Sequence, residues 1–239
     1  MIETFAALLL AHVLADFVLQ TNWMAARKRQ FPVLILHGLV VLITAQLCLG
    51  HVTAWPLLAL AATHFAIDAI KTYGDFSGLA GFLTDQGAHL IILATVAWIA
   101  PDLWQTGFWA MQAPPLPAPN TLPSTMILIA GAVLATRAGG FATALMMKPY
   151  DTAMSQTAES GLPGAGQRIG VLERGLIYLL VLLGELGGIG FLVAAKSILR
   201  FGTVSGDRKA TEYVIIGTLF SFGWALVVAI AVKALLSQL

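Results

Sequence analysis

Three pairs of a histidine and an aspartate, each pair four residues apart, lie inside apolar stretches of the sequence. The pairs are His12 with Asp16, His64 with Asp68, and Asp85 with His89, and His37 adds a fourth imidazole. Residues four apart share one face of an α-helix, so each pair can present an imidazole and a carboxylate to the same point. Because ionisable groups are costly in a membrane, such helices normally turn them toward the interior of the bundle. The pattern therefore predicts a buried polar site.

Imidazole and carboxylate ligands together favour Zn²⁺, Mn²⁺ or Fe²⁺ over Ca²⁺ and Mg²⁺, which prefer oxygen ligands. We expect a divalent metal, with zinc first and manganese or iron as the other choices. The expected metal ligands are His12, Asp16, His37, His64, Asp68, Asp85 and His89. They exceed the needs of one tetrahedral ion, so the set could also hold two ions bridged by a carboxylate.

Two other roles stay open for the aspartates. One of them could orient a histidine through a hydrogen bond, and another could act as a general base in catalysis. Asp16 and Asp85 are the candidates for the catalytic base. A metal-free polar network or a proton relay is the alternative interpretation of the whole set.

Seven apolar segments must position these side chains. They are Ile2–Gln20, Phe31–Gly50, Ala54–Lys71, Phe82–Ala100, Ser124–Met147, Val171–Arg200 and Glu212–Leu235. The chain has 239 residues, of which 58% are hydrophobic and 10% charged, whereas a soluble domain carries roughly a quarter charged residues. Each segment is long enough to cross a hydrocarbon core of about 30 Å as a helix. The sequence thus predicts an all-α, polytopic membrane helical bundle.

We expect one integral membrane domain over residues 1–239. Within it, residues 1–100 form a four-helix half with the metal site, and residues 101–123 form a proline-rich outer loop. Residues 124–239 supply supporting helices and a cytoplasmic loop at 149–170.

Basic residues in short loops indicate the orientation of the chain. Arg27–Arg29 follow the first segment, Lys71 ends the third, and Lys148 and Arg168 flank the loop after the fifth. Since these loops alternate along the chain, we expect them in the cytoplasm and the N-terminus outside. Counted inward at about 1.5 Å per residue, all the candidate ligands fall roughly 5–12 Å below the cytoplasmic surface.

The sixth segment conflicts with this orientation. A single crossing by Val171–Arg200 places Arg200, Arg208 and Lys209 outside, against the positive-inside rule. The glycine-rich run at 184–190 predicts either a kinked helix or a re-entrant hairpin, and we favour the kinked helix.

Composition also limits the partners of the protein. With a net charge of +1 and no basic cluster of the kind that forms a nucleic-acid surface, we expect no nucleic-acid partner. The single cysteine, Cys48, excludes an internal disulfide and a cysteine-rich metal site. Membrane lipids are the partners that we expect.

The run HVLADFVLQTNWMAARK (His12–Lys28), followed by HFAIDAIK (His64–Lys71) and DQGAH (Asp85–His89), resembles the bacterial inner-membrane family called domain of unknown function 3307. The later stretches ERGLIYLL, GFLVAAKSILRF and EYVIIGTLFSFGWA also resemble it. That family has no established activity. The resemblance implies a multi-pass protein of the bacterial inner membrane.

More loosely, the His/Asp pairs are similar to those of membrane-bound metal-dependent hydrolases. More remotely, they are similar to the zinc-dependent phospholipase C and S1/P1 nuclease group, whose all-helical sites bind zinc and cleave phosphoesters. This similarity implies that the residues named above are metal ligands. The chain lacks the metal-binding N-terminal tryptophan of that group, which argues against a site with three ions.

Our leading hypothesis is a metal-dependent hydrolase that acts on a lipid or lipid-linked phosphoester near the cytoplasmic leaflet. The alternatives are a transporter or channel for a divalent metal or protons, and a membrane scaffold with a structural metal. A transport path needs polar groups that continue to the outer leaflet, and there the first four segments offer few, such as Thr4, Thr44 and Gln46. This scarcity favours a one-sided site.

Overall fold

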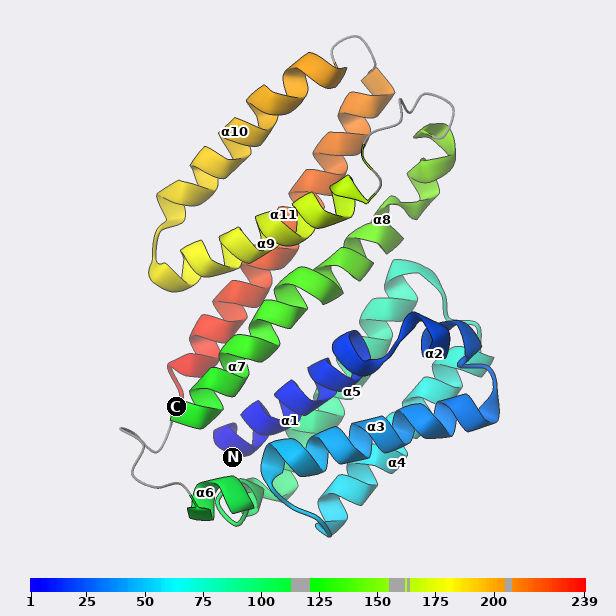
Figure 1. Cartoon of the computed structure of the whole chain (residues 1–239), viewed down its shortest axis with the longest axis vertical. Helices are drawn as coiled ribbons and strands as arrows, with labels where there is room; N and C mark the ends of the chain where they lie inside the picture. Colours follow the sequence, from blue (N-terminus) through cyan, green and yellow to red (C-terminus); the bar gives the residue numbers. More distant parts are fainter. Residues whose placement is uncertain (113–120, 155–161, 163, 205–207) are drawn as a thin grey trace. The chain divides into compact units, whose positions relative to one another are not determined.

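The computed structural model describes residues 1–112, 121–154, 162, 164–204 and 208–239. In these ranges the regular secondary structure is α-helix with short 3₁₀ and π stretches (Figure 1). The predicted all-α fold is confirmed for the described residues.

Among the described residues, five helices are long and apolar enough to cross a membrane, as judged by length and composition. They are Ile2–Leu19, Phe31–Leu49, Gly78–Ile99, Thr121–Asp151 and Arg208–Leu236. These match the first, second, fourth, fifth and seventh predicted segments, and they indicate a multi-pass membrane protein. The third segment forms α4 (Trp55–Tyr73), which is as long as the second but carries the charged Asp68 and Lys71.

The chain divides into two compact units. One comprises Met1–Val133 with Leu235–Leu239, and the other comprises Leu134–Ala234. We call them unit 1 and unit 2 and describe each by itself.

The central helix of unit 1 is α1 (Ile2–Leu14). It packs against α3 (Phe31–Leu49), α5 (Gly78–Ile99) and α7 (Thr121–Val133), while α4 packs against both α3 and α5. Every side chain from Ala6 to Val13 is buried. A helix that is apolar all around its circumference is stable only when other helices surround it, which explains the position of α1.

A π-helical stretch, η1 (Ala15–Leu19), continues α1 and ends with a hydrogen bond of 3.0 Å from Gln20 N to Ala15 O. The short helix α2 (Asn22–Arg27) follows, and the hydroxyl of its N-cap Thr21 accepts from Met24 N. This cap satisfies one of the free N–H groups at the start of the helix. The linker from Thr21 to Gln30 thereby leads the chain from η1 into α3.

The predicted outer loop at 101–123 is more ordered than expected. It includes a 3₁₀ turn, η2 (Pro101–Leu103), and α6 (Phe108–Gln112), and α7 begins at Thr121. Thr4 explains part of this order, because its hydroxyl donates to Pro101 O and accepts from Trp104 N. Residues 113–120 lie outside the described residues.

Unit 2 contains η3 (Leu134–Ala138), α8 (Gly139–Met154), α9 (Ala165–Leu183), α10 (Leu186–Val204) and most of α11 (Arg208–Leu236). The predicted loop at 149–170 is wrong at both ends. Helix α8 continues through Pro149 to Met154, and α9 already begins at Ala165. Residues 155–161 and 163 lie outside the described residues.

The favoured interpretation of the sixth segment, one kinked helix, is wrong. Figure 1 shows α9 and α10 as a helical hairpin, and Lys196 of α10 forms an ion pair of 2.7 Å with Glu173 of α9. The reversal occurs at Gly184, which has a φ of 82°. Glycine adopts this left-handed conformation without the steric cost that a Cβ would bring, and it therefore ends α9.

The hairpin removes the conflict in the predicted orientation. The end of α10 returns to the end of unit 2 at which α9 begins (Figure 1). Arg208 and Lys209, at the start of α11, then lie on the same side as Arg168, in agreement with the positive-inside rule. The orientation itself stays a prediction.

Candidate metal centre

All the predicted ligands come together in unit 1. They are His12 on α1, Asp16 on η1, His37 on α3, His64 and Asp68 on α4, and Asp85 and His89 on α5. Their ligand atoms form three overlapping groups, each with all its atoms within 4.8 Å of one another. The groups are His12–Asp16–His64, His37–His64–Asp68 and Asp68–Asp85–His89. The histidines are at most 3% exposed, and the Asp16 side chain, the most accessible of the seven, is 9% exposed.

The tightest part of the centre consists of Asp16 Oδ1, His37 Nε2, His64 Nε2 and Asp68 Oδ2, which we call the four-atom set. His37 Nε2 lies 3.3 Å from each of the two carboxylate oxygens. His64 Nε2 lies 3.5 Å from each of them, and the two nitrogens are 3.3 Å apart. Zinc bonds of 2.0–2.1 Å in tetrahedral geometry place neighbouring ligands about 3.3–3.4 Å apart. These five separations fit edges of the coordination shell of a small divalent ion. His37, His64 and Asp68 form one compact group that could hold it, whereas Asp16 groups with His12 and His64.

The electrostatics of the four-atom set also favour a cation. Carboxylate oxygens only accept hydrogen bonds, and a neutral imidazole has one donor nitrogen and one acceptor nitrogen. When both Nε2 atoms carry hydrogen, the two N–H groups point at one small region and repel each other. When one carries hydrogen, it can donate to the other nitrogen at 3.3 Å or to a carboxylate, and the remaining acceptors stay unpaired within the set. When both carry lone pairs, four acceptors lie close together. A divalent cation suits this last case, which makes the set a candidate metal site.

Gln86 orients His12. Its side-chain oxygen lies 3.2 Å from His12 Nε2, and its nitrogen donates to Asp16 Oδ2 at 3.3 Å and to Asp85 Oδ2 at 3.1 Å. Since a carboxylate cannot donate, the amide nitrogen must face the two aspartates and the amide oxygen must face the imidazole. His12 Nε2 is then the donor and Nδ1 carries the lone pair, as a ligand atom requires.

His89 is oriented by the backbone. Its Nδ1 donates to the carbonyl oxygen of Asp85 at 2.9 Å, so in the neutral ring Nε2 carries the lone pair. Within the described part of the chain, His89 Nε2, His12 Nδ1 and Asp85 Oδ1 are buried without a hydrogen-bond partner. Buried polar atoms are normally paired, so these three suit a second ion next to the four-atom set.

The centre also includes two lysines, which the sequence analysis did not identify. Lys28, at the end of α2, lies 2.7 Å from Asp68 Oδ2, and Lys71, on α4, lies 2.6 Å from Asp85 Oδ2. Helical spacing could have revealed Lys71, because it follows Asp68 by three residues and shares its face. Nothing in the sequence reveals Lys28, which reaches the centre through the fold of the linker.

The spacing argument assumed a regular α-helix through His12 and Asp16. Instead, Asp16 lies on the π-helical η1, and the carboxylate is 4.0 Å from His12 Nδ1 but 3.3 Å from His37 Nε2. A π stretch rotates the following side chains relative to an α-helix, and such stretches are frequent at functional sites. The π stretch turns Asp16 toward α3.

His51 is the histidine outside the centre. Its Nε2 lies 2.7 Å from the carbonyl oxygen of Leu103, where it donates a hydrogen bond. The ring therefore helps to attach η2 to the end of α3 and provides a natural control for experiments on the other histidines.

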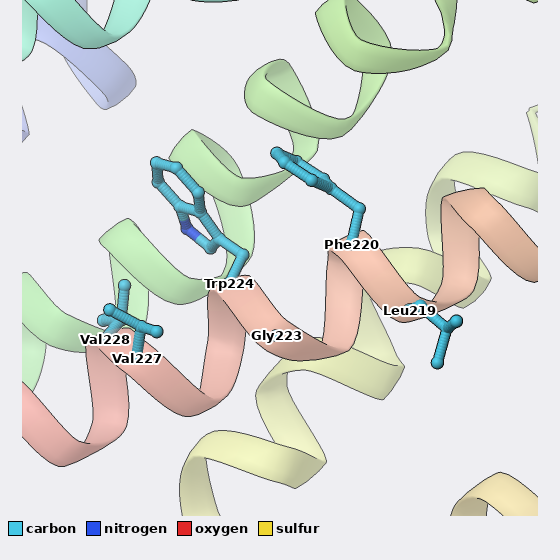
Figure 2. Close-up of a pocket in the computed structure, with 6 residues that line it drawn as sticks. All are labelled: Leu219, Phe220, Gly223, Trp224, Val227 and Val228. Atoms are coloured by element: carbon cyan, nitrogen blue, oxygen red, sulfur yellow. The ribbon is translucent and has the colours of Figure 1, made fainter.

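A pocket of ≈ 340 Å³ lies on α11 in unit 2 (Figure 2). It is lined by Leu219, Phe220, Gly223, Trp224, Val227 and Val228. Its one polar side-chain atom, Trp224 Nε1, donates to the carbonyl oxygen of Leu134. The pocket offers apolar contact and no group for catalysis.

Comparisons with known proteins find one similarity, which covers part of unit 1. No curated protein and no solved structure matches the chain. The similarity to metal-dependent hydrolases and to the phospholipase C and nuclease group thus gains no support from them. One family model, described as "Protein of unknown function (DUF3307)", matches residues 4–112, which contain all the candidate ligands, Gln86 and both lysines. Over residues 4–112, a little under half of its length, this chain is similar to the DUF3307 family.

Proposed function

We propose that the protein is a membrane-embedded, metal-dependent hydrolase that acts on a lipid or lipid-linked phosphoester. The observation that carries the proposal is the four-atom set, with its distances of 3.3–3.5 Å between two imidazoles and two carboxylates. A bound divalent ion would lower the pKa of a coordinated water and polarise a phosphoryl oxygen, which is how metals promote phosphoester hydrolysis.

The two candidate bases have different surroundings. Asp16 Oδ1 belongs to the four-atom set, which suits a metal ligand. Asp85 Oδ2 accepts from Lys71 and Gln86, while Oδ1 has no hydrogen-bond partner among the described residues. With one ion in the four-atom set, Oδ1 of Asp85 stays free to accept a proton, so we assign the general base to Asp85 in that state. A second ion at Asp85 would take this oxygen as a ligand instead.

The structure of α1 favours a hydrolase over a transporter. Above His12 the buried side chains from Ala6 to Ala11 are all apolar, and Thr4 is engaged by Pro101 and Trp104. A transport path for an ion needs polar groups along its length. The centre instead ends in an apolar layer on this side, as a one-sided active site does.

Metal content and activity test this proposal. The protein is purified in detergent without chelator, and bound metals are measured by elemental mass spectrometry in the wild type, in a His37→Ala/His64→Ala variant and in His51→Ala. We expect about one to two zinc, manganese or iron ions per chain in the wild type and His51→Ala, and loss in the double variant. The wild type and His51→Ala should hydrolyse a short-chain phosphatidic acid, and the double variant, which lacks metal, should not.

Two results would contradict the proposal in different ways. Absence of metal after reconstitution with each of the three ions leaves the centre as a polar network or proton relay. Metal that is bound stoichiometrically without hydrolysis of any phosphoester indicates a structural ion.

A further inference from the structure

The two lysines of the centre occupy the boundary between the buried cluster and its surroundings. The side chains of Lys28 and Lys71 are 17% and 32% exposed, whereas those of their partners Asp68 and Asp85 are 2% and 3% exposed. Each ammonium group thus faces a buried carboxylate on one side and remains accessible on the other.

Metal binding and these lysines compete for the same carboxylates. Asp68 Oδ2 contacts Lys28 and is also part of the four-atom set. Asp85 contacts Lys71 and belongs with Asp68 and His89 to a group that could hold an ion. An ion that binds these carboxylates neutralises them and leaves the half-buried ammonium groups without a counter-ion. Since an unpaired charge in this setting is costly, the loaded centre needs an anion.

The net charge of the centre leads to the same conclusion. Three carboxylates and two ammonium groups, with neutral imidazoles, sum to −1. One divalent ion changes this sum to +1, and two ions change it to +3. A phosphate ester with one or two negative charges brings the centre back toward neutrality, whereas an uncharged substrate does not.

The surroundings of Lys28 and Lys71 resemble a membrane–water interface. Arg27 lies over the ring of Trp23, and Arg29 pairs with Asp75 across the turn between α4 and α5. Exposed apolar side chains accompany these charges on the linker and on the adjoining ends of α3 and α4: Trp23, Phe31, Ile70, Tyr73 and Phe76. Aromatic and basic side chains together are typical of the depth at which lipid phosphates lie.

We propose that Lys28 and Lys71 bind the phosphate group of the substrate, and that this substrate is a lipid with a phosphate monoester headgroup. The inference rests on the proposed function, because metal binding at Asp68 and Asp85 is what frees the two ammonium groups. Arginine and aromatic side chains around the lysines favour a lipid phosphate over free phosphate.

Binding measurements on the metal-loaded protein in detergent test the inference. The ligands are dihexanoyl phosphatidic acid, dihexanoyl phosphatidylcholine and inorganic phosphate, and binding is followed by isothermal titration calorimetry. The proteins are the wild type, Lys28→Met/Lys71→Met, Lys28→Arg/Lys71→Arg and the control Lys233→Met, a lysine on the exposed face of α11. Metal content is measured on each sample.

We expect phosphatidic acid to bind the wild type and Lys233→Met equally, and phosphatidylcholine to bind neither. The double methionine variant should retain its metal and bind phosphatidic acid about tenfold more weakly or worse, because it loses both charge-assisted contacts. The arginine variant should recover most of the binding. Stronger binding of inorganic phosphate than of phosphatidic acid would identify a soluble phosphate as the ligand and overturn the lipid assignment.

A second measurement needs no variant, which matters if the methionine variant fails to fold. An amine-acetylating reagent is applied to the wild type, and the modified lysines are quantified by mass spectrometry. Metal should increase the acetylation of Lys28 and Lys71, phosphatidic acid should then decrease it, and Lys233 should not respond. Unchanged acetylation in a metal-loaded protein overturns the inference alone. A protein that binds no metal overturns the proposed function together with it.

Discussion

The Nε2 atoms of His37 and His64 lie 3.3 Å apart, although 27 positions separate the residues in the sequence. Gly50 ends α3 in the left-handed conformation, and α4 then packs back along α3. The same packing places both nitrogens within 3.5 Å of Asp16 and Asp68. The centre is thus made from contacts between helices, so the binding of an ion there would depend on helix packing and would stabilise it in turn.

Removal of the metal should therefore destabilise the fold of unit 1. An ion at a hundredfold excess over its dissociation constant stabilises the native state by about 2.7 kcal/mol. We expect a chelator to lower the midpoint of thermal unfolding of the wild type in detergent, as followed by tryptophan fluorescence. The His37→Ala/His64→Ala variant should not respond to the chelator. Identical unfolding of the wild type with and without chelator would argue against a resident ion.

Replacement of Gln86 should weaken metal binding without removing a ligand. In Gln86→Leu the imidazole of His12 loses the acceptor at its Nε2, and the amide no longer links Asp16 with Asp85. Loss of such an orienting partner typically lowers metal affinity about 10- to 100-fold. Competition with a chromophoric chelator measures the affinity. Gln105→Leu is the control, because Gln105 donates to Glu3, and neither residue belongs to the centre. Equal metal affinities in the two variants would contradict the role assigned to Gln86.

Gly184 should be the residue that permits the α9–α10 hairpin. An alanine at a φ of 82° places its Cβ against the following carbonyl, and left-handed backbone costs about 1–2 kcal/mol for such a residue. Gly184→Ala should therefore lower the unfolding midpoint. Gly166→Ala is the matched control, since it lies inside α9 with open space around its Cα and alanine favours helix. A Gly184→Ala protein as stable as the control would show that the turn does not depend on glycine.

Cysteine labelling can test the topology of the hairpin. Cys48 is the only cysteine, so single cysteines can be introduced into a Cys48→Ser background. We expect Gln167→Cys and Arg208→Cys to react with a membrane-impermeant maleimide from the same side. Thr53→Cys, at the turn between α3 and α4, should react from the opposite side. Labelling of positions 167 and 208 from opposite sides of the membrane would contradict the hairpin and support a single crossing by the sixth segment.

The clustering of the candidate ligands could be predicted from the sequence because burial of charge is so unfavourable. Histidines and aspartates in apolar helices need polar partners. Because residues four apart lie on one face of a helix, both members of each pair must find their partners on the same side. His12, His64 and Asp85 were assigned to a common site by this reasoning, and the structure brings them together with the rest of the set.

Tertiary structure alone decided the parts that depend on backbone irregularity or on distant segments. The π stretch that turns Asp16 toward His37 has no periodic signature in the sequence. In the sequence, Lys28 belongs to a basic loop whose charge is already accounted for by the predicted membrane orientation. Only the path of the linker brings Lys28 to Asp68. The reversal at Gly184 was one of two outcomes of the same glycine-rich run, and the Lys196–Glu173 pair accompanies the hairpin. Local patterns report which side chains must be buried, whereas the packing of helices determines which of them meet.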